Sequence, residues 1–158
     1  MRLMAGTGVR ESVTLAGLAE RARVARTFVG AVLAGHPGGD MGVLLTSELF
    51  GNSVRHSRSG APGGTVTVAV IAEDGFVRVE VTDQDGLGVP RVRRADRDEE
   101  GGRGLGLVAA LATRWGWQRR QGQTVTWFEL CDLLQPMQHS AVSGMGANSS
   151  DVQLPGLL

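Results

Sequence analysis

The chain has 158 residues, and its basic and acidic side chains balance to a formal net charge of zero. Its length, with 42% hydrophobic and 20% charged residues, predicts one globular domain with a proper core. Zero net charge provides no basic field, which argues against nucleic acid or an anionic membrane as a partner. The single cysteine, Cys131, excludes an internal disulfide and a cysteine-based zinc cluster. No apolar stretch approaches the roughly 20 residues that span a bilayer, so we expect a cytoplasmic protein.

The first half of the chain predicts one strand and two helices. Residues 1–9 are expected to be flexible, and residues 10–15 are expected to form a short edge strand. Apolar side chains at helical spacing predict a helix over residues 15–34. After GHPGGD, Asp40 is the expected N-cap of a second helix over residues 41–56. The apolar positions of the first helix are Leu18, Ala22, Ala25, Val29 and Val32.

A hairpin is predicted next, from two valine-rich runs at residues 65–72 and 76–83. They flank Glu73-Asp74-Gly75, which is typical of a hairpin turn. The stretch DQDGLGVP follows, and the charged residues 89–102 are expected to form a mobile loop.

The last part of the chain predicts a third helix over residues 105–115. A second hairpin, with strands at residues 115–120 and 124–131, is expected around Gln121-Gly122. The Ser, Gly, Gln and Pro content of residues 132–158 predicts a disordered tail.

This order of elements places residues 10–131 in one domain of the α+β class. Hairpins imply antiparallel pairing, and amphipathic helices need a sheet face to cover. We therefore expect a two-layer α/β sandwich, with three helices on one face of a mostly antiparallel mixed sheet.

Glu48 and Asn52, in the stretch ELFGN, are the first candidate site. Four residues apart on a helix, their side chains are neighbours. A carboxylate and a carboxamide offer the oxygen ligands that Mg²⁺ prefers, and the carboxylate could also polarise a water or a hydroxyl. Taken alone, the pair is more simply explained as two side chains that point to solvent.

Asp83 and Asp85, in DQDGLGVP, raise the question of which one faces a ligand. Asp83 is in phase with Val77, Val79 and Val81, so it should point toward the buried side of its strand. A buried carboxylate needs a donor, and the exocyclic amine of a base is one candidate. Turn capping explains Asp83 equally well, and it is the preferred reading for Asp85.

The stretch GGRGLGLV, residues 101–108, opens a predicted helix with glycines. Such glycines let backbone N–H groups approach an anion at the helix N-terminus, although an ordinary flexible loop has the same composition. Gly104 to Ala109 also fits the G-x-G-x-x-A pattern of dinucleotide-binding folds. That pattern needs a buried strand directly before it, whereas the charged RVRRADRDEE precedes it here.

Taken together, ELFGNSVRHS, VEVTDQDGLG and GGRGLGLV resemble the N, G1 and G2 boxes of the GHKL ATPases. That family has the Bergerat fold and includes gyrase B and the histidine kinases. The short single-domain form and the ending TVTWFEL resemble bacterial anti-sigma factor serine kinases. The resemblance covers roughly residues 10–131.

The resemblance implies a role for each matching residue. Asn52 would bind the Mg²⁺ that bridges the phosphates of ATP, and Glu48 would activate the incoming nucleophile. An aspartate would accept the adenine amino group, and Gly86 and Gly88 would shape the turn after it. The family pattern is D-x-G-x-G, whereas this chain has D-x-D-G-x-G. Because strand phase points Asp83 inward, we expect Asp83 to contact the base and Asp85 to be an extra turn residue.

The glycine-rich helix start would hold phosphate, beneath a lid formed by residues 89–101. Arg103 fits either a phosphate contact or a surface position on that lid. The phosphate-binding residues implied by the resemblance are Gly102, Arg103, Gly104, Leu105 and Gly106.

The first functional hypothesis is an ATP-dependent protein serine/threonine kinase that acts as an anti-sigma factor. It would phosphorylate a small antagonist protein and so control a sigma factor. The alternatives are a non-catalytic ATP-dependent switch that sequesters a partner and, far behind, a dinucleotide-binding oxidoreductase. Resemblance also implies that such domains commonly act as homodimers. Apolar side chains of the first long helix could serve this contact, but core packing explains them equally.

Overall fold

The computed structural model describes residues 8–84 and 104–131 of the chain. The loop predicted over residues 89–102, the tail over residues 132–158 and most of the flexible N-terminus lie outside these residues. The described residues form, in chain order, β1 (Val9–Ala16), the short helix η1 (Ala19–Arg21), α1 (Ala22–Val32), α2 (Gly39–His56), the short helix η2 (Arg58–Gly60), β2 (Thr65–Glu73), β3 (Phe76–Gln84), α3 (Gly104–Leu111), β4 (Arg114–Arg120) and β5 (Gln123–Leu130).

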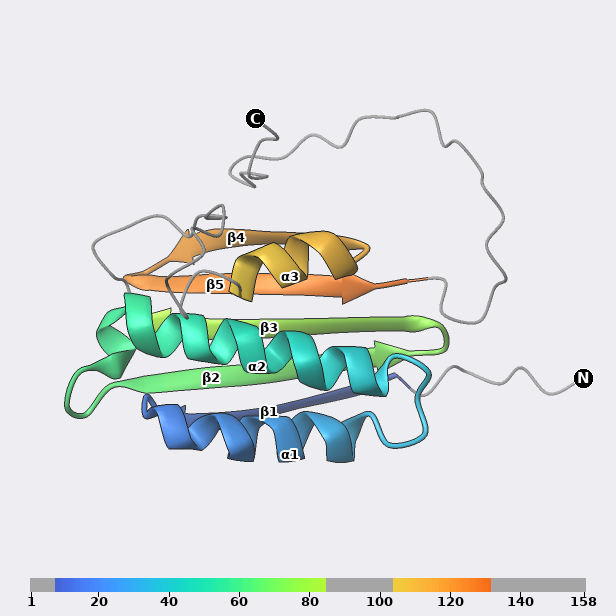
Figure 1. Cartoon of the computed structure of the whole chain (residues 1–158), viewed down its shortest axis with the longest axis horizontal. Helices are drawn as coiled ribbons and strands as arrows, with labels where there is room; N and C mark the ends of the chain where they lie inside the picture. Colours follow the sequence, from blue (N-terminus) through green and yellow to red (C-terminus); the bar gives the residue numbers. More distant parts are fainter. Residues whose placement is uncertain (1–7, 85–103, 132–158) are drawn as a thin grey trace, which may run out of the picture.

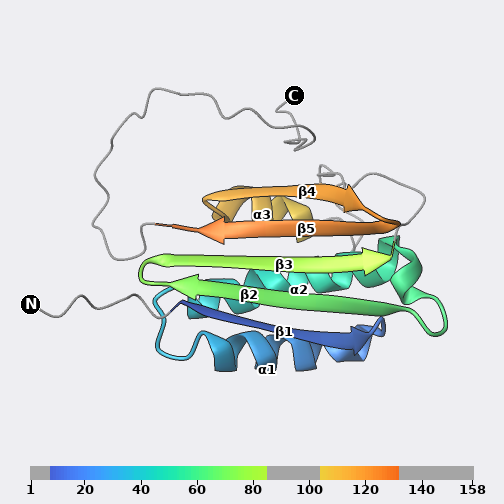
Figure 2. The same cartoon turned by 180° about the vertical axis from the view of Figure 1, so that it is seen from behind.

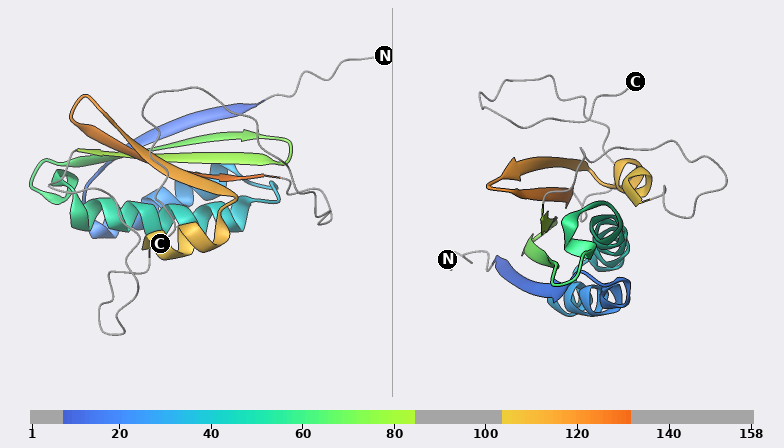
Figure 3. Two further views of the ribbon diagram at one scale, coloured as in Figure 1. Left: turned by 90° about the horizontal axis from the view of Figure 1, so that it is seen from above. Right: turned by 90° about the vertical axis from the view of Figure 1, so that its left-hand side faces the viewer.

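The described strands form one sheet in the order β1-β2-β3-β5-β4, and all of their pairings are antiparallel. The three α-helices lie on one face of this sheet, and no helix of the described residues lies over the opposite face (Figures 1 and 2). Figure 3 shows the two layers from the side and from the end. The predicted two-layer α+β sandwich with three helices on one face is confirmed, although the sheet, expected to be mixed, is antiparallel in every pairing of the described residues. Within the described residues, no helix is both long and apolar enough to cross a membrane.

The core lies between the sheet and the helices because side chains alternate along each strand. On β2 and β3 the buried residues occupy every second position, as the valine spacing predicts. Their partners are apolar side chains from one face of each helix. The fully buried members include Val29 of α1, Leu45 and Phe50 of α2, Val68, Val79 and Val81 of the sheet, and Phe128 of β5.

Both predicted hairpins are present. The β2–β3 hairpin turns at Asp74-Gly75, where Gly75 has a φ of 72°. The β4–β5 hairpin turns at Gln121-Gly122, with φ values of 48° and 75°. In the β4–β5 turn both central residues have positive φ, which matches the twist of the flanking strands, whereas in the β2–β3 turn only Gly75 does. Each two-residue turn sets the register of its hairpin.

The predicted helix over residues 15–34 is wrong in its first third. β1 continues to Ala16, and α1 begins only at Ala22. The cause is a tertiary contact at Gly17, whose N–H donates to the carbonyl of Gly64 at 2.9 Å. A Cβ at Gly17 would lie 1.7 Å from the carbonyl oxygen of Ser59. The chain therefore passes too close to the η2 turn to start a helix there.

Two other element boundaries also differ from their predictions. Asp40 does not cap α2, because the helix starts at Gly39 and its N-cap is Gly38, with no side-chain cap. The helix predicted to reach Trp115 ends at Leu111. The N–H of Thr113 donates to the carbonyl of Glu129 at 2.9 Å, so pairing with β5 takes over from the helix at this point.

Candidate functional site

Glu48 and Asn52 lie one turn apart on α2, and Arg55 continues their stripe one turn further on. Glu48 and Asn52 are half-buried, whereas Arg55 is exposed. The guanidinium of Arg55 lies against Gly51, since a Cβ built on Gly51 would be 3.1 Å from Nη1. All three side chains therefore occupy one face of α2.

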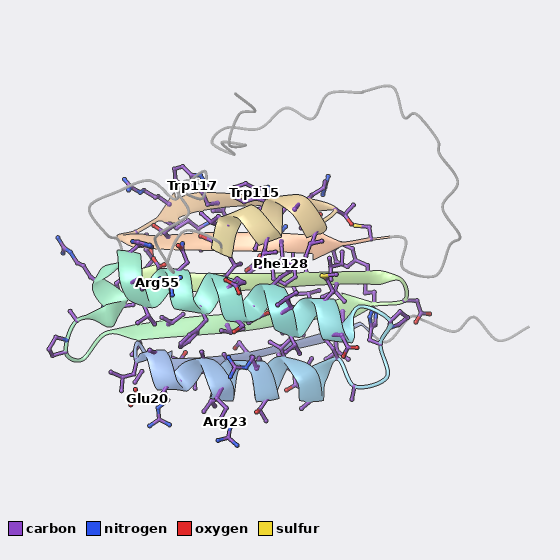
Figure 4. All side chains as sticks on the ribbon, viewed as in Figure 1. Glu20, Arg23, Arg55, Trp115, Trp117 and Phe128 are labelled. Carbon is purple, nitrogen blue, oxygen red and sulfur yellow. The ribbon has the colours of Figure 1, made fainter. Side chains whose placement is uncertain are left out.

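This stripe faces away from α1. On the other side of α2, the Oγ of Ser47 accepts a 3.0 Å hydrogen bond from Arg26 of α1, and Val43 packs at Gly30 of α1. Figure 4 shows Arg55 on the side of α2 that faces β5 and α3. Glu48 and Asn52 thus border the region between α2 and α3 on the helical face of the sheet.

Asp83 lies at the end of β3, on that same face of the sheet. It is 8% exposed and in phase with the buried valines of β3, so the inward direction predicted from strand phase is confirmed. Its cross-strand neighbour on β5 is Thr124, which is 4% exposed. The next inward residue of β5, Thr126, is 5% exposed. The end of this face therefore carries a carboxylate and two hydroxyls in an otherwise apolar layer.

A chain of hydrogen bonds ties the end of β3 to the end of α2. The N–H of Gln84 donates to Oγ of Ser59 at 2.9 Å, and the N–H of Ser59 donates to Oγ of Ser57 at 3.0 Å. The hydroxyl of Ser57 donates in turn to the carbonyl of Ser53 at 2.7 Å. Because Ser59 is fully buried, this connection fixes Asp83 relative to the helix that carries Glu48 and Asn52. Residues 57–64 (SRSGAPGG), which include η2, are thus an ordered part of the site's scaffold.

The start of α3 supplies the third predicted part of the site. Gly104 is its first residue, Leu105 is 3% exposed and packs into the core, and Gly106 has open space where a side chain would be. The remaining predicted site residues, Gly86, Gly88, Gly102 and Arg103, lie outside the described residues together with Asp85.

Thr124 and Arg55 are two candidate site residues that the sequence reasoning missed. Arg55 could have been found from helical spacing, since it follows Asn52 by three residues. Thr124 required the register between β3 and β5, which the sequence does not give locally. No group of three or more His, Cys, Asp or Glu side chains that could hold a metal occurs in residues 8–84 and 104–131.

The comparison with protein-family models decides the family of this chain. Residues 14–130 match the model of the histidine kinase-like ATPase domain. The chain belongs to this family. The resemblance to the GHKL ATPases, drawn from the three boxes, is thereby confirmed. The chain is accordingly assigned as an ATP-binding domain of this type.

Solved structures show the same fold for this histidine kinase-like ATPase domain. One match is the crystal structure of the RsbU and RsbW domains of Rv1364c from Mycobacterium tuberculosis, with a TM-score of 0.57 and 21% sequence identity. The match covers 78% of this chain and 32% of that one, so this chain spans about a third of the length of its structural neighbour. No curated protein sequence matches the chain.

Proposed function

We propose that this histidine kinase-like ATPase domain is a cytoplasmic protein serine/threonine kinase. It acts as an anti-sigma factor that phosphorylates a small antagonist protein and thereby captures or releases a sigma factor. The observation that carries the proposal is the placement of Glu48 and Asn52 on one stripe of α2, with Asp83 buried on the adjoining end of the sheet. Family membership supports ATP as the bound nucleotide.

In this proposal Asp83 recognises the adenine base by accepting a hydrogen bond from it. Asp83 is 8% exposed, and its carboxylate can accept more than one hydrogen bond. The exocyclic amino group of adenine is such a donor, and an acceptor-only carboxylate selects it over a carbonyl at the same position. Thr124, opposite Asp83, offers a hydroxyl that can donate to or accept from the base or a bridging water.

Glu48 is the general base of the proposed reaction. Its carboxylate accepts the proton of the substrate serine hydroxyl as the hydroxyl oxygen forms a bond to the γ-phosphorus of ATP. The bond from that phosphorus to the β-phosphate oxygen breaks, and ADP leaves. The position of Glu48 on a regular, packed helix holds this base in one orientation.

Asn52 is the protein ligand proposed for Mg²⁺. Within the described residues it offers one carboxamide oxygen to an ion, which fits a magnesium ion that takes most of its ligands from phosphates and water. When bound, Mg²⁺ supplies charge neutralisation at the transferring phosphoryl group. Arg55, on the same stripe as Asn52, adds a fixed positive charge beside the phosphates.

The start of α3 is proposed to hold the phosphates through backbone N–H groups at its positive end. The open space at Gly106 leaves room for a phosphate to approach the backbone. The proposed phosphate-binding set is Gly102, Arg103, Gly104, Leu105 and Gly106, and Gly86 and Gly88 are proposed to shape the turn beneath the base.

The kinase proposal is tested by phosphoryl transfer. We expect purified protein, γ-labelled ATP and the cognate antagonist to give a labelled serine or threonine on the antagonist. Glu48→Gln should lower this transfer by about 10²-fold or more while ATP affinity is retained. Asp74→Asn, in the hairpin turn at the other end of β3, is the control and should transfer at the wild-type rate. Tight ATP binding without transfer to any candidate antagonist would refute the kinase.

A non-catalytic ATP switch is the second candidate, and the lengthened D-x-D-G-x-G segment is the feature that favours it. In that case Glu48→Gln would leave the release of the partner on ATP binding unchanged. A dinucleotide oxidoreductase is disfavoured by the fold. Dinucleotide-binding domains are built on parallel βαβ units, whereas every strand pairing in the described residues is antiparallel.

A further inference from the structure

Leu44 on α2 and Leu111 on α3 expose apolar surface close to the candidate site. Leu44 is 42% exposed and Leu111 is 41% exposed, whereas the other large apolar side chains described on these two helices are buried or half-buried. Leu44 precedes Glu48 by four residues, so their side chains are neighbours on one stripe of α2. Exposed apolar surface therefore begins one helical turn from the proposed general base.

The end of α3 lies toward the same end of the helical layer as the start of α2. His36, which precedes α2, bonds the carbonyl of Glu73 beside the β2–β3 turn through its Nε2 at 2.9 Å. Thr113, which follows α3, donates its N–H to the carbonyl of Glu129, and β5 ends beside that same turn. The two helices contact each other and run in opposite directions (Figure 1). Their exposed leucines thus lie toward one end of the layer.

Met41 and Leu107 connect the two exposed leucines with the core. Met41 precedes Leu44 by three residues and Leu107 precedes Leu111 by four, so each shares the side of its helix with an exposed leucine. Both are half-buried and pack against the core. Since Val108 faces the core, the right-handed turn of α3 directs Leu111 toward α2 (Figure 3). These four side chains form the apolar patch: Met41, Leu44, Leu107 and Leu111.

The nucleotide of the proposed function occupies the opposite end of the stripe on α2. The base lies at Asp83, and the end of its strand is tied to the end of α2 through Ser59. Asn52 and Arg55, near that end of α2, face the phosphates. Glu48 therefore lies between the phosphates and the apolar patch, an order that rests on the proposed function.

The in-line geometry of phosphoryl transfer indicates what approaches the apolar patch. The attacking oxygen and the leaving oxygen lie on opposite sides of the transferred phosphorus. Because the leaving oxygen belongs to the phosphates at Asn52, the attacking serine hydroxyl comes from the side of Glu48 that carries Leu44. The chain that bears this serine then passes over the apolar patch.

The spacing of side chains on α2 selects an apolar residue two positions from that serine. Glu48 and Leu44 are separated by about 6 Å along the helix axis. In an extended segment, residues two positions apart point to the same side and lie about 6.5 Å apart. A serine at Glu48 thus places the side chain two positions away on Leu44, with Leu111 beside it.

We propose that the apolar patch is the docking surface for the phosphoacceptor segment of the protein substrate. The segment is extended and carries a large apolar residue two positions from its serine. Burial of this residue against Leu44 and Leu111 contributes affinity for the substrate. Glu48 remains the proton acceptor, so the apolar patch acts on the KM for the protein substrate rather than on the chemical step.

Two nonapeptides of identical composition test the spacing. GQLQSQLQG carries leucines two positions from the serine, and GQQLSLQQG carries them directly beside it. With γ-labelled ATP and the full chain, we expect kcat/KM to be about tenfold or more higher for GQLQSQLQG. Leu44→Ser and Leu111→Ser should each remove most of this preference by raising KM, with ATP affinity retained. Leu18→Ser, at a side chain that is 45% exposed outside the apolar patch, is the control and should behave as the wild type does.

The possible outcomes distinguish a wrong docking surface from a wrong kinase assignment. The docking surface is wrong if the antagonist protein is labelled but neither peptide is, or if the two peptides have equal kcat/KM. It is also wrong if Leu44→Ser leaves KM unchanged. A dimer of the free chain that Leu44→Ser converts to monomers would overturn it too, because a second copy would then cover the apolar patch. No transfer to the antagonist or to either peptide would refute the kinase as well.

Discussion

Asp83 and Thr124 face each other across β3 and β5, and both are more than nine-tenths buried at the end of the sheet. Around them the inward side chains of β3 are valines. Polar groups in such a layer need defined partners, so this pair marks the point where the apolar interior becomes a polar site. The pair lies beside Gln84, whose N–H is bonded to the buried Ser59.

Ser59→Ala tests whether the η2 turn holds this end of the sheet. The substitution leaves the N–H of Gln84 without its acceptor, which should lower the free energy of unfolding by about 1–3 kcal/mol. Urea denaturation measures the change. Ser47→Ala, which removes the acceptor of an exposed arginine, should cost less than about 1 kcal/mol. Equal losses for the two variants would show that Ser59 has no special role.

Gly64→Ala tests the close packing around the same turn. A Cβ at Gly64 would lie 2.2 Å from the carbonyl oxygen of Ser59, so the backbone must shift. We expect a loss of about 2–3 kcal/mol in the free energy of unfolding. Gly30→Ala is the matched control, because its nearest neighbour is a side-chain methyl of Val43 at 3.6 Å. In the interior of α1 it should stabilise the protein by about 0.5–1 kcal/mol. Equal destabilisation by Gly64→Ala and Gly30→Ala would contradict the close packing of Gly64 against Ser59.

Arg78→Ala tests the face of the sheet opposite the helices. Arg78 bonds Glu80 at 2.9 Å and Glu129 at 2.7 Å, and its guanidinium lies 4.3 Å from the ring centre of Trp127. The side chain of Glu129 is only 6% exposed, so loss of Arg78 should cost about 2–4 kcal/mol. Arg114 also bonds Glu129 but is 69% exposed, so Arg114→Ala should cost less than about 1 kcal/mol. Thermal unfolding would rank the stability of the two variants. A larger loss for Arg114→Ala than for Arg78→Ala would rule out Arg78 as the main partner of Glu129.

Local signals in the sequence predicted the hairpins and the central helix well. Asp74-Gly75 and Gln121-Gly122 are turns whose chemistry acts over two residues, so the sequence alone specifies them. The predicted start of α1 and the predicted end of α3 were wrong because contacts between residues distant in sequence determine these two boundaries. Gly17 is held against Ser59, and Thr113 pairs with Glu129.

In the candidate site, too, local signals predicted some positions, and contacts distant in sequence determine the others. Strand phase predicted that Asp83 points inward, and helical spacing predicted that Glu48 and Asn52 share a face. Thr124 was missed because its place beside Asp83 depends on the register of β5 against β3. The roles of these residues stay predictions until nucleotide binding is measured.

Isothermal titration of Mg-ATP into the wild type and into the Asp83→Asn, Asp85→Ala and Asn52→Ala variants tests the central claim most directly. We predict one site per chain, with affinity lowered about 10- to 100-fold by Asp83→Asn and nearly unchanged by Asp85→Ala. Asn52→Ala should remove most of the gain in ATP affinity that Mg²⁺ gives the wild type. The absence of ATP binding to the wild type, or full affinity in Asp83→Asn with loss in Asp85→Ala, would contradict the account.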